Sequence, residues 1–144
     1  MTAIVLAMDG SVHSRHAASW LASTKSLARP LIVHVVHVSP TIGRTGFSTV
    51  DLETENREEA RVVFESARDL LSGCVSELHE HRLRGNAAEE VIRFASERNA
   101  DLIVIGARGI GALKSSIIGS VASKIASQSV VPALVVSGKH LPTA

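Results

Sequence analysis

The sequence predicts an α/β protein in which helices cover both faces of a parallel β-sheet. Apolar runs of strand length recur along the chain, helical periods separate them, and the apolar residues are small. Apolar residues make up 45% of the 144-residue chain and aromatic residues only 3%, so Val, Ile, Leu and Ala must build the core. That composition favours buried strands packed under helices. We expect a single domain over residues 1–144, because chains of about this length form one core.

Five segments have the character of strands. Four of them are apolar runs that are rich in β-branched residues and bounded by turn-forming residues. They lack polar alternation, which is typical of strands buried on both faces. The fifth is more polar and suits an exposed edge. The apolar runs are 3–8, 31–38, 101–106 and 133–138, and the polar segment is 76–85.

Helical periods separate these strands. Asn86 with Glu89 resembles a capping box and predicts a helix that starts just after Gly85. The resulting βαβαβαβαβ alternation predicts a doubly wound sheet with right-handed crossovers. Residues 39–50, rich in Pro, Gly, Ser and Thr, predict a loop. The helical periods are Ala17, Trp20, Leu21, Leu27 and Ala28; Ala60, Val63, Phe64, Ala67 and Leu71; Ala88, Val91, Ile92 and Ala95; and Ile118, Val121, Ala122 and Ile125.

The charge, the cysteine content and the first residues of the sequence exclude several classes of protein. With 15 Lys and Arg against 14 Asp and Glu, and no long basic run, a nucleic-acid partner is not expected. Cys74 is the only cysteine, which excludes an internal disulfide, and we expect it to pack as a small apolar residue. The first apolar run is too short for a signal peptide or a membrane span. We therefore expect a cytoplasmic protein without membrane association.

The glycine-rich stretch "GARGIGALKSSIIGSV", residues 106–121, follows the fourth strand directly. Glycines are costly in backbone entropy, so the chain either turns tightly here or lies against a ligand. In an open parallel sheet, ligands bind beyond the carboxyl ends of the strands, where the winding direction reverses. If the first and fourth strands are neighbours at that point, Asp9 and Gly106 flank the same crevice.

That pairing suits a nucleotide. A carboxylate accepts hydrogen bonds from ribose hydroxyls, and glycine amides with a helix N-terminus receive phosphate oxygens. Gly119 and Ser120 stand at the start of the last helix, whose first turn has unpaired N–H groups. Arg108 and Lys114 could neutralise phosphate charge from the same stretch. The spacing is not that of a Walker loop. A purely structural turn remains the alternative reading of the glycines.

The spacing of the stretch resembles a known family. "GARG", nine further residues and then "GS" match the Gly-x2-Gly-x9-Gly-Ser/Thr signature of the ATP-binding branch of the universal stress protein family. "AMDGS" near the start, "HVVHV" at the second strand and "PALVVSG" at the end are also similar to that family, and they occur in its order. The resemblance covers essentially the whole chain.

The resemblance implies a five-stranded, Rossmann-like parallel sheet of order 3-2-1-4-5, with ATP or a related adenine nucleotide between the first and fourth strands. A Mg²⁺ ion, where present, would come with the nucleotide. The site residues that it implies are Ala7, Met8, Asp9 and the backbone of Val35 around the adenosine, and Gly106, Gly109, Gly119, Ser120 and Val121 around the ribose and phosphates.

Neither a dedicated metal site nor a catalytic residue is expected. The seven histidines include no quartet with zinc spacing, because His34 and His37 are out of phase on a strand and His79 and His81 lie on the polar edge segment. The sequence contains no nucleophile elbow, and no residue in the glycine-rich stretch can be identified as the one that orients water for ATP hydrolysis. At most, weak ATPase activity is predicted.

The last strand would form an open apolar edge, which is prone to association. The family commonly pairs this strand with its symmetry mate, so we expect a homodimer through residues 132–138. The function that follows is that of an ATP-binding sensor or regulator of the stress response, acting on an unknown protein partner. Two alternatives stay open: a slow ATP hydrolase, and a dimeric interaction protein that binds no nucleotide.

Overall fold

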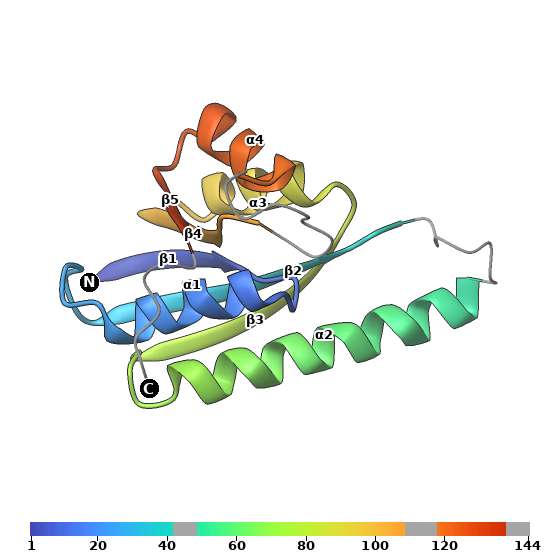
Figure 1. The fold of residues 1–144 in the computed structure, drawn as a ribbon, viewed down its shortest axis with the longest axis horizontal. Coiled ribbons are helices and arrows are strands. Elements are labelled where there is room, and N and C mark those ends of the chain that lie inside the picture. Colours follow the sequence, from blue (N-terminus) through green and yellow to red (C-terminus); the bar gives the residue numbers. More distant parts are fainter. Residues whose placement is uncertain (42–48, 109–117, 138–144) are drawn as a thin grey trace.

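A computed structural model describes residues 1–41, 49–108 and 118–137 (Figure 1). Its strands form one five-stranded parallel sheet of order β3-β2-β1-β4-β5, as predicted. The strands are β1 (Thr2–Ala7), β2 (Leu31–Ser39), β3 (Glu77–Arg84), β4 (Leu102–Gly106) and β5 (Ala133–Val136), and the helices are α1 (Val12–Ser23), α2 (Thr49–Leu71), α3 (Ala87–Glu97) and α4 (Ser120–Gln128).

The helices lie in two layers, one on each face of the sheet (Figure 1). Helices α1 and α2 pack on one face, where buried Leu21 and Leu71 join the inward side chains of the strands. Helices α3 and α4 pack on the other face, where Val91 and Ile125 do the same. The central strands β1 and β4 are therefore covered on both sides, which explains their unbroken apolar runs.

The first helix ends earlier than its apolar period predicts. Helix α1 stops at Ser23, and Thr24 follows in an extended conformation, so Leu27 and Ala28 lie outside the helix. The Thr24 hydroxyl oxygen accepts a hydrogen bond from the Ser26 N–H at 3.2 Å. Such a side-chain turn competes with the next helical hydrogen bond and diverts the chain.

The segment predicted as a loop over 39–50 is shorter than expected. Ser39 is buried within β2, and Thr49 already belongs to α2. Residues 42–48 lie outside the described residues. Cys74 is also placed differently from the prediction: it is partly exposed in the turn after α2, with its thiol 3.7 Å from the Ser72 carbonyl oxygen. Of the helices in the described ranges, none combines the length and the apolar character that crossing a membrane requires.

Candidate functional site: a cleft at the carboxyl edge of the sheet

A pocket of about 440 Å³ opens where β1, β2 and β4 end. Strands β1 and β4 are neighbours, with Ala7 opposite Ile105, and β2 lies on the other side of β1. This is the point where the winding direction reverses, and it is where an open parallel sheet binds ligands. The predicted site residues that line the pocket are Ala7, Met8, Asp9, Gly106, Arg108, Gly119, Ser120 and Val121.

The chain that leaves β1 is held by backbone contacts on one side of the pocket. The Met8 N–H donates to the Val36 carbonyl at 3.0 Å. Asp9 Oδ1 accepts from the Ser11 N–H at 2.9 Å, and Ser11 in turn caps α1 by accepting from the Ser14 N–H. These local bonds turn the chain from strand into helix within a few residues. The Asp9 carboxylate is thereby fixed at the mouth of the pocket.

Gly106 at the end of β4 is required by close packing. A Cβ atom at this position would lie 2.5 Å from the His13 carbonyl oxygen of α1, which is far inside van der Waals contact. The backbone of α1 therefore rests directly on the end of β4. The first glycine of the stretch serves the fold, whatever it does for a ligand.

The two ends of the glycine-rich stretch meet beside the pocket. The Gly119 N–H donates to the Ala107 carbonyl at 2.7 Å, which returns the chain to the end of β4 before α4 begins. Gly109 and Lys114 lie outside the described residues. Arg108, just before that gap, lines the pocket.

The N-terminus of α4 directs backbone N–H groups that precede its helical hydrogen bonds toward this space. The first bond of the helix runs from the Ser123 N–H to the Gly119 carbonyl at 2.9 Å. The N–H groups of Ser120, Val121 and Ala122 therefore precede the helical ladder, and all three residues line the pocket. Gly119 is the N-cap and contributes no side-chain bond. The aligned peptide dipoles add a partial positive charge at this end.

The prediction for Val35 is wrong in register. Its side chain is fully buried in the core under α1 and α2, and it is not part of the pocket. Val38 lines the pocket instead. The run "HVVHV" contains two His-Val pairs three residues apart, and only the second pair stands at the end of the strand. Pro40, which follows Ser39, marks that end and is the signal that selects the second pair.

Two different walls face each other across the pocket. One is apolar and lies on the side of the sheet that carries α3 and α4; the other is polar and lies on the side that carries α1 and α2. The first is formed by Ala7, Val36, Val38, Ala87, Val91, Ile105 and Ala122, and the second by Asp9, Ser14, His37 and Glu59. Sequence reasoning missed most of these residues. Ala87 and Val91 could have been predicted, since the capping box places them on the first turns of α3.

His37 shapes the polar wall. It is 5% exposed, and its Nδ1 lies 2.9 Å from the Met8 carbonyl oxygen. Because a carbonyl only accepts, Nδ1 carries the proton, and Nε2 of the neutral ring is an acceptor. Within the described part of the chain, Nε2 has no hydrogen-bond partner. The ring thus ties the end of β1 to β2 beside the pocket.

The arrangement combines the elements that a phosphorylated planar ligand needs. The apolar wall can cover a ring, the amides at α4 can receive an anion, and the Asp9 carboxylate can accept from hydroxyl groups. The described residues include no group of three or more His, Cys, Asp or Glu side chains arranged to hold a metal ion. The anion-receiving part of the site is built from backbone.

The fold and the cleft define an α/β protein with a ligand site at the reversal point of a 3-2-1-4-5 parallel sheet. The model of the Universal stress protein family matches residues 1–137, and the chain belongs to this family.

Two curated relatives match most of the chain. Universal stress protein MJ0531 of Methanocaldococcus jannaschii is 31% identical over 136 residues, covering 92% of this chain and 80% of the relative. A universal stress protein of Thermus aquaticus is 33% identical over 135 residues, covering 92% of this chain and 96% of the relative.

Solved structures share the fold. Protein MJ0577 superposes with a TM-score of 0.79 at 24% identity, covering 94% of this chain and 95% of the other. A universal stress protein in complex with cAMP gives 0.65 at 19% identity, covering 94% and 96%. An Arabidopsis thaliana protein of the family with AMP bound gives 0.63 at 14% identity, covering 99% and 97%. At these identities the likeness establishes the common architecture.

Proposed function

We propose that the protein binds an adenine nucleotide, with ATP as the principal ligand, and acts as a regulator in the stress response. The observation that carries the proposal is the cleft itself, in which an apolar wall stands beside the first-turn amides of a helix N-terminus. Relatives of the same fold are known with cAMP and with AMP, which supports an adenine nucleotide as the ligand class.

The adenine ring is proposed to lie against the apolar wall and to meet the backbone of Val38. In a parallel strand, the N–H and C=O of one residue point toward the same neighbouring strand. The Val36 carbonyl accepts from Met8, on the β1 side. Val38, two residues further, points to that same side, beyond the end of β1 at Ala7. Its backbone groups are therefore directed into the space above β1, where the edge of a base can pair with them.

The phosphates are proposed to bind at the N-terminus of α4. Three backbone N–H groups, at Ser120, Val121 and Ala122, precede the helical ladder there. An anion at a helix N-terminus gains about 0.3–1 kcal/mol from the dipole, in addition to its hydrogen bonds. Arg108 and the expected contact of Gly109 would add to this binding. In this proposal Asp9 accepts from the ribose hydroxyls, and Mg²⁺ arrives with the triphosphate, near Asp9 and Glu59.

The assembly and setting are part of the same proposal. Strand β5 is an edge of the sheet, and Val130 just before it is 90% exposed. An apolar edge of this kind favours pairing with a second copy, so we propose a homodimer through residues 132–138. The protein would act in the cytoplasm and pass its nucleotide state to a protein partner. Such signalling requires that the nucleotide favour one surface arrangement over another.

Ser120→Asp tests the phosphate site without disrupting the helix. An acidic residue in the first turn stabilises a helix, and the same charge repels a bound phosphate. We expect ATP affinity, measured by isothermal titration calorimetry, to fall on the order of a hundredfold or more, because a charge–charge contact at this range is worth several kcal/mol. Ser127→Asp, which adds the same charge at the far end of α4, is the matched control and should bind normally.

The outcome that would remove the proposal is equally direct. Two results together would contradict nucleotide binding: denaturing mass spectrometry finds no adenine nucleotide in freshly purified protein, and calorimetry finds no heat of ATP binding. The protein would then be interpreted as a dimeric interaction protein that binds no nucleotide. Phosphate release that disappears in Ser120→Asp would instead point to the slow hydrolase.

A further inference from the structure

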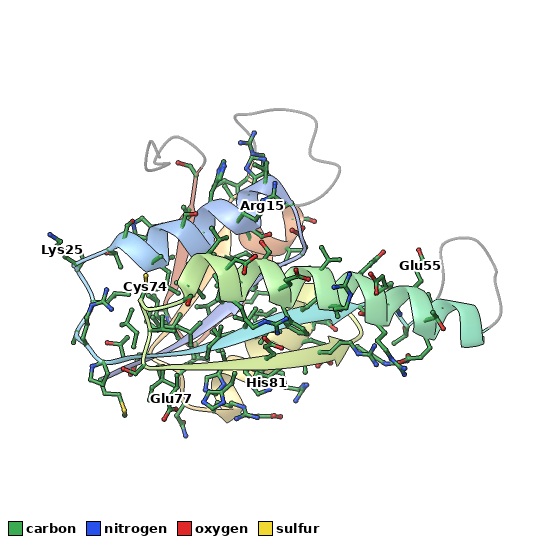
Figure 2. All side chains as sticks on the ribbon, turned by 90° about the horizontal axis from the view of Figure 1, so that it is seen from below. Arg15, Lys25, Glu55, Cys74, Glu77 and His81 are labelled. Carbon is green, nitrogen blue, oxygen red and sulfur yellow. The ribbon has the colours of Figure 1, made fainter. Side chains whose placement is uncertain are left out.

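Three histidines gather on the face of the sheet that carries α3, away from the cleft. His34 comes from β2, and His79 and His81 come from β3. His34 is paired with His79 in the strand register, and His81, two residues further, is on the same face. Figure 2 shows His81 and Glu77 on the opposite side of β3 from α2. We call His34, His79 and His81 the histidine cluster.

Two members of the histidine cluster share one hydrogen bond. His34 Nδ1 and His81 Nε2 are 2.9 Å apart, so one nitrogen carries a proton and the other accepts it. The His34 ring also stacks on His79, with centroids 5.0 Å apart. Phe94 of α3 covers the pair, with its centroid 4.6 Å from that of His81 and 5.9 Å from that of His34.

Burial and nearby positive charge disfavour added protons on this pair. Arg98, at the end of α3, places its guanidinium carbon 4.6 Å from the Phe94 ring centroid. Burial lowers the pKa of His81 to about 4, with further contributions from Arg98, His34 and His79. Burial also lowers the pKa of His34, again with help from Arg98 and His79, and Glu77 opposes the shift. Near neutral pH both rings are uncharged.

We propose that the His34–His81 hydrogen bond is an acid-sensitive latch that fastens β3 and α3 to β2 and opens when the pair takes up protons. The first proton keeps the bond but places a cation beside Arg98 in a half-buried site. A second proton sets two N–H groups against each other, which no rotation of the rings can satisfy at this distance. The two rings then have to separate, and each partly exposed ring bonds to water in place of its partner, which removes the side-chain tie between β2 and β3.

The direction of the pH dependence follows from proton uptake. In the unfolded chain a histidine has a pKa of about 6.5, whereas both rings of the folded latch hold protons more weakly. The unfolded state therefore binds more protons below about pH 6.5, and acid favours it. The contribution of the latch is fully present above that pH and is lost as the pH falls toward the folded pKa of about 4 for His81.

The latch is connected to the cleft through two elements. Helix α3 carries Phe94 over the pair, and its first turns supply Ala87 and Val91 to the apolar wall. Strand β2 carries His34 and, four residues later, Val38. Opening the latch would loosen that wall and weaken nucleotide binding; this second step rests on the proposed function.

The test compares His81→Gln with the wild-type chain. A glutamine amide can still pair with His34 but does not ionise, and His79→Gln is the matched control because His79 lies 3.1 Å from Glu77 and outside the shared bond. Urea unfolding is followed from about pH 7.5 to about pH 4.5 with EDTA present. We expect the unfolding constant of the wild type to rise relative to His81→Gln by up to about tenfold per pH unit below about pH 6. His79→Gln should stay close to the wild type, because His79 makes only one of the smaller contributions to the pKa values of His34 and His81.

Parallel pH curves for the wild type and His81→Gln would overturn the latch. If the variant fails to fold, imidazole proton NMR on the wild type decides, since a His81 pKa near its ordinary value overturns the proposal and one well below it supports the proposal. A wild-type curve that changes when EDTA is omitted would mean that a metal, not a proton, controls the cluster.

The link between the latch and the cleft is tested separately. The dissociation constant of ATP is measured at about pH 7 and about pH 5 for the wild type and for His81→Gln. A greater loss of affinity in the wild type supports the link, and an equal loss removes it. If ATP fails to bind at pH 7, the proposed function is wrong. The pH dependence of urea unfolding still tests the latch in that case, because it does not depend on nucleotide binding.

Discussion

The cleft and the histidine cluster are built from different parts of the chain. The cleft is formed largely by backbone atoms, which come from the N-terminus of α4, the end of β2 and the glycine at the end of β4. Close contacts hold this backbone in place, such as the 2.7 Å hydrogen bond between Gly119 and Ala107. In the histidine cluster, imidazole and phenyl rings from β2, β3 and α3 make the contacts. A site made of backbone responds to steric change, and a site made of imidazoles responds to protons.

The same contrast appears within one strand at His34 and His37. They point to opposite faces of β2, and each bonds through Nδ1 at 2.9 Å. His37 bonds to a carbonyl oxygen, which fixes its proton on Nδ1; His34 bonds to another imidazole, whose protonation can change. The partner therefore decides how firmly the position of the proton is fixed in each of the two bonds.

Gly106→Ala should have the largest effect of the substitutions on stability. The new Cβ would stand 2.5 Å from a backbone oxygen of α1, and backbone cannot rotate away as a side chain can. We expect a loss of about 3 kcal/mol in the free energy of unfolding by urea, the upper part of the range for overpacking.

Gly73→Ala is the matched control for that substitution. Gly73 has a φ of +76° but no atom within 4 Å of the added Cβ, so the substitution is strained without being blocked. It should cost about 1 kcal/mol. Equal losses for the two alanines would show that the backbone of α1 gives way at Gly106 and that its close approach to β4 sets no strict requirement there.

His37→Ala should follow, with a loss of about 2 kcal/mol. The substitution leaves the Met8 carbonyl without its donor and opens space beside Phe64, whose ring lies edge-on to the imidazole. His37→Asn restores a donor close to the position of Nδ1 and should recover part of the loss. Urea unfolding above about pH 7 measures both, where His34 and His81 are uncharged. No recovery in the asparagine variant would assign the loss to packing alone.

Much of the architecture could be predicted from the sequence because its signals are local. Apolar runs without polar alternation marked the buried strands, and the capping box marked α3, where Asn86 does accept from the Glu89 N–H at 3.1 Å. The strand order came from the family resemblance, and the sheet confirms it. Element ends were less predictable: the Thr24 side-chain turn that ends α1 interrupts an apolar period that otherwise continues.

The candidate site was predictable in part for the same reason. Asp9, Gly106 and Gly119 follow or precede elements with clear boundaries, so their place at the pocket could be inferred. Val35 failed because "HVVHV" offers two equivalent pairs and register depends on where β2 ends. The shared bond of His34 and His81 depends on strands 47 residues apart in sequence, and only the pairing of β2 with β3 reveals it.

Asn86→Ala should cost about 1 kcal/mol, less than Gly106→Ala or His37→Ala, and it tests whether the cleft and the histidine cluster respond separately. The Asn86 side chain caps α3, the helix that contributes Ala87 to the cleft at one end and Phe94 to the histidine cluster further along. Fraying should begin at the capped end and leave Phe94 packed. We therefore expect nucleotide affinity to fall a few fold while the pH dependence of urea unfolding stays that of the wild type. Asn86→Asp, which keeps the cap, is the control, and a changed pH dependence in Asn86→Ala would mean that α3 moves as one rigid unit between cleft and cluster.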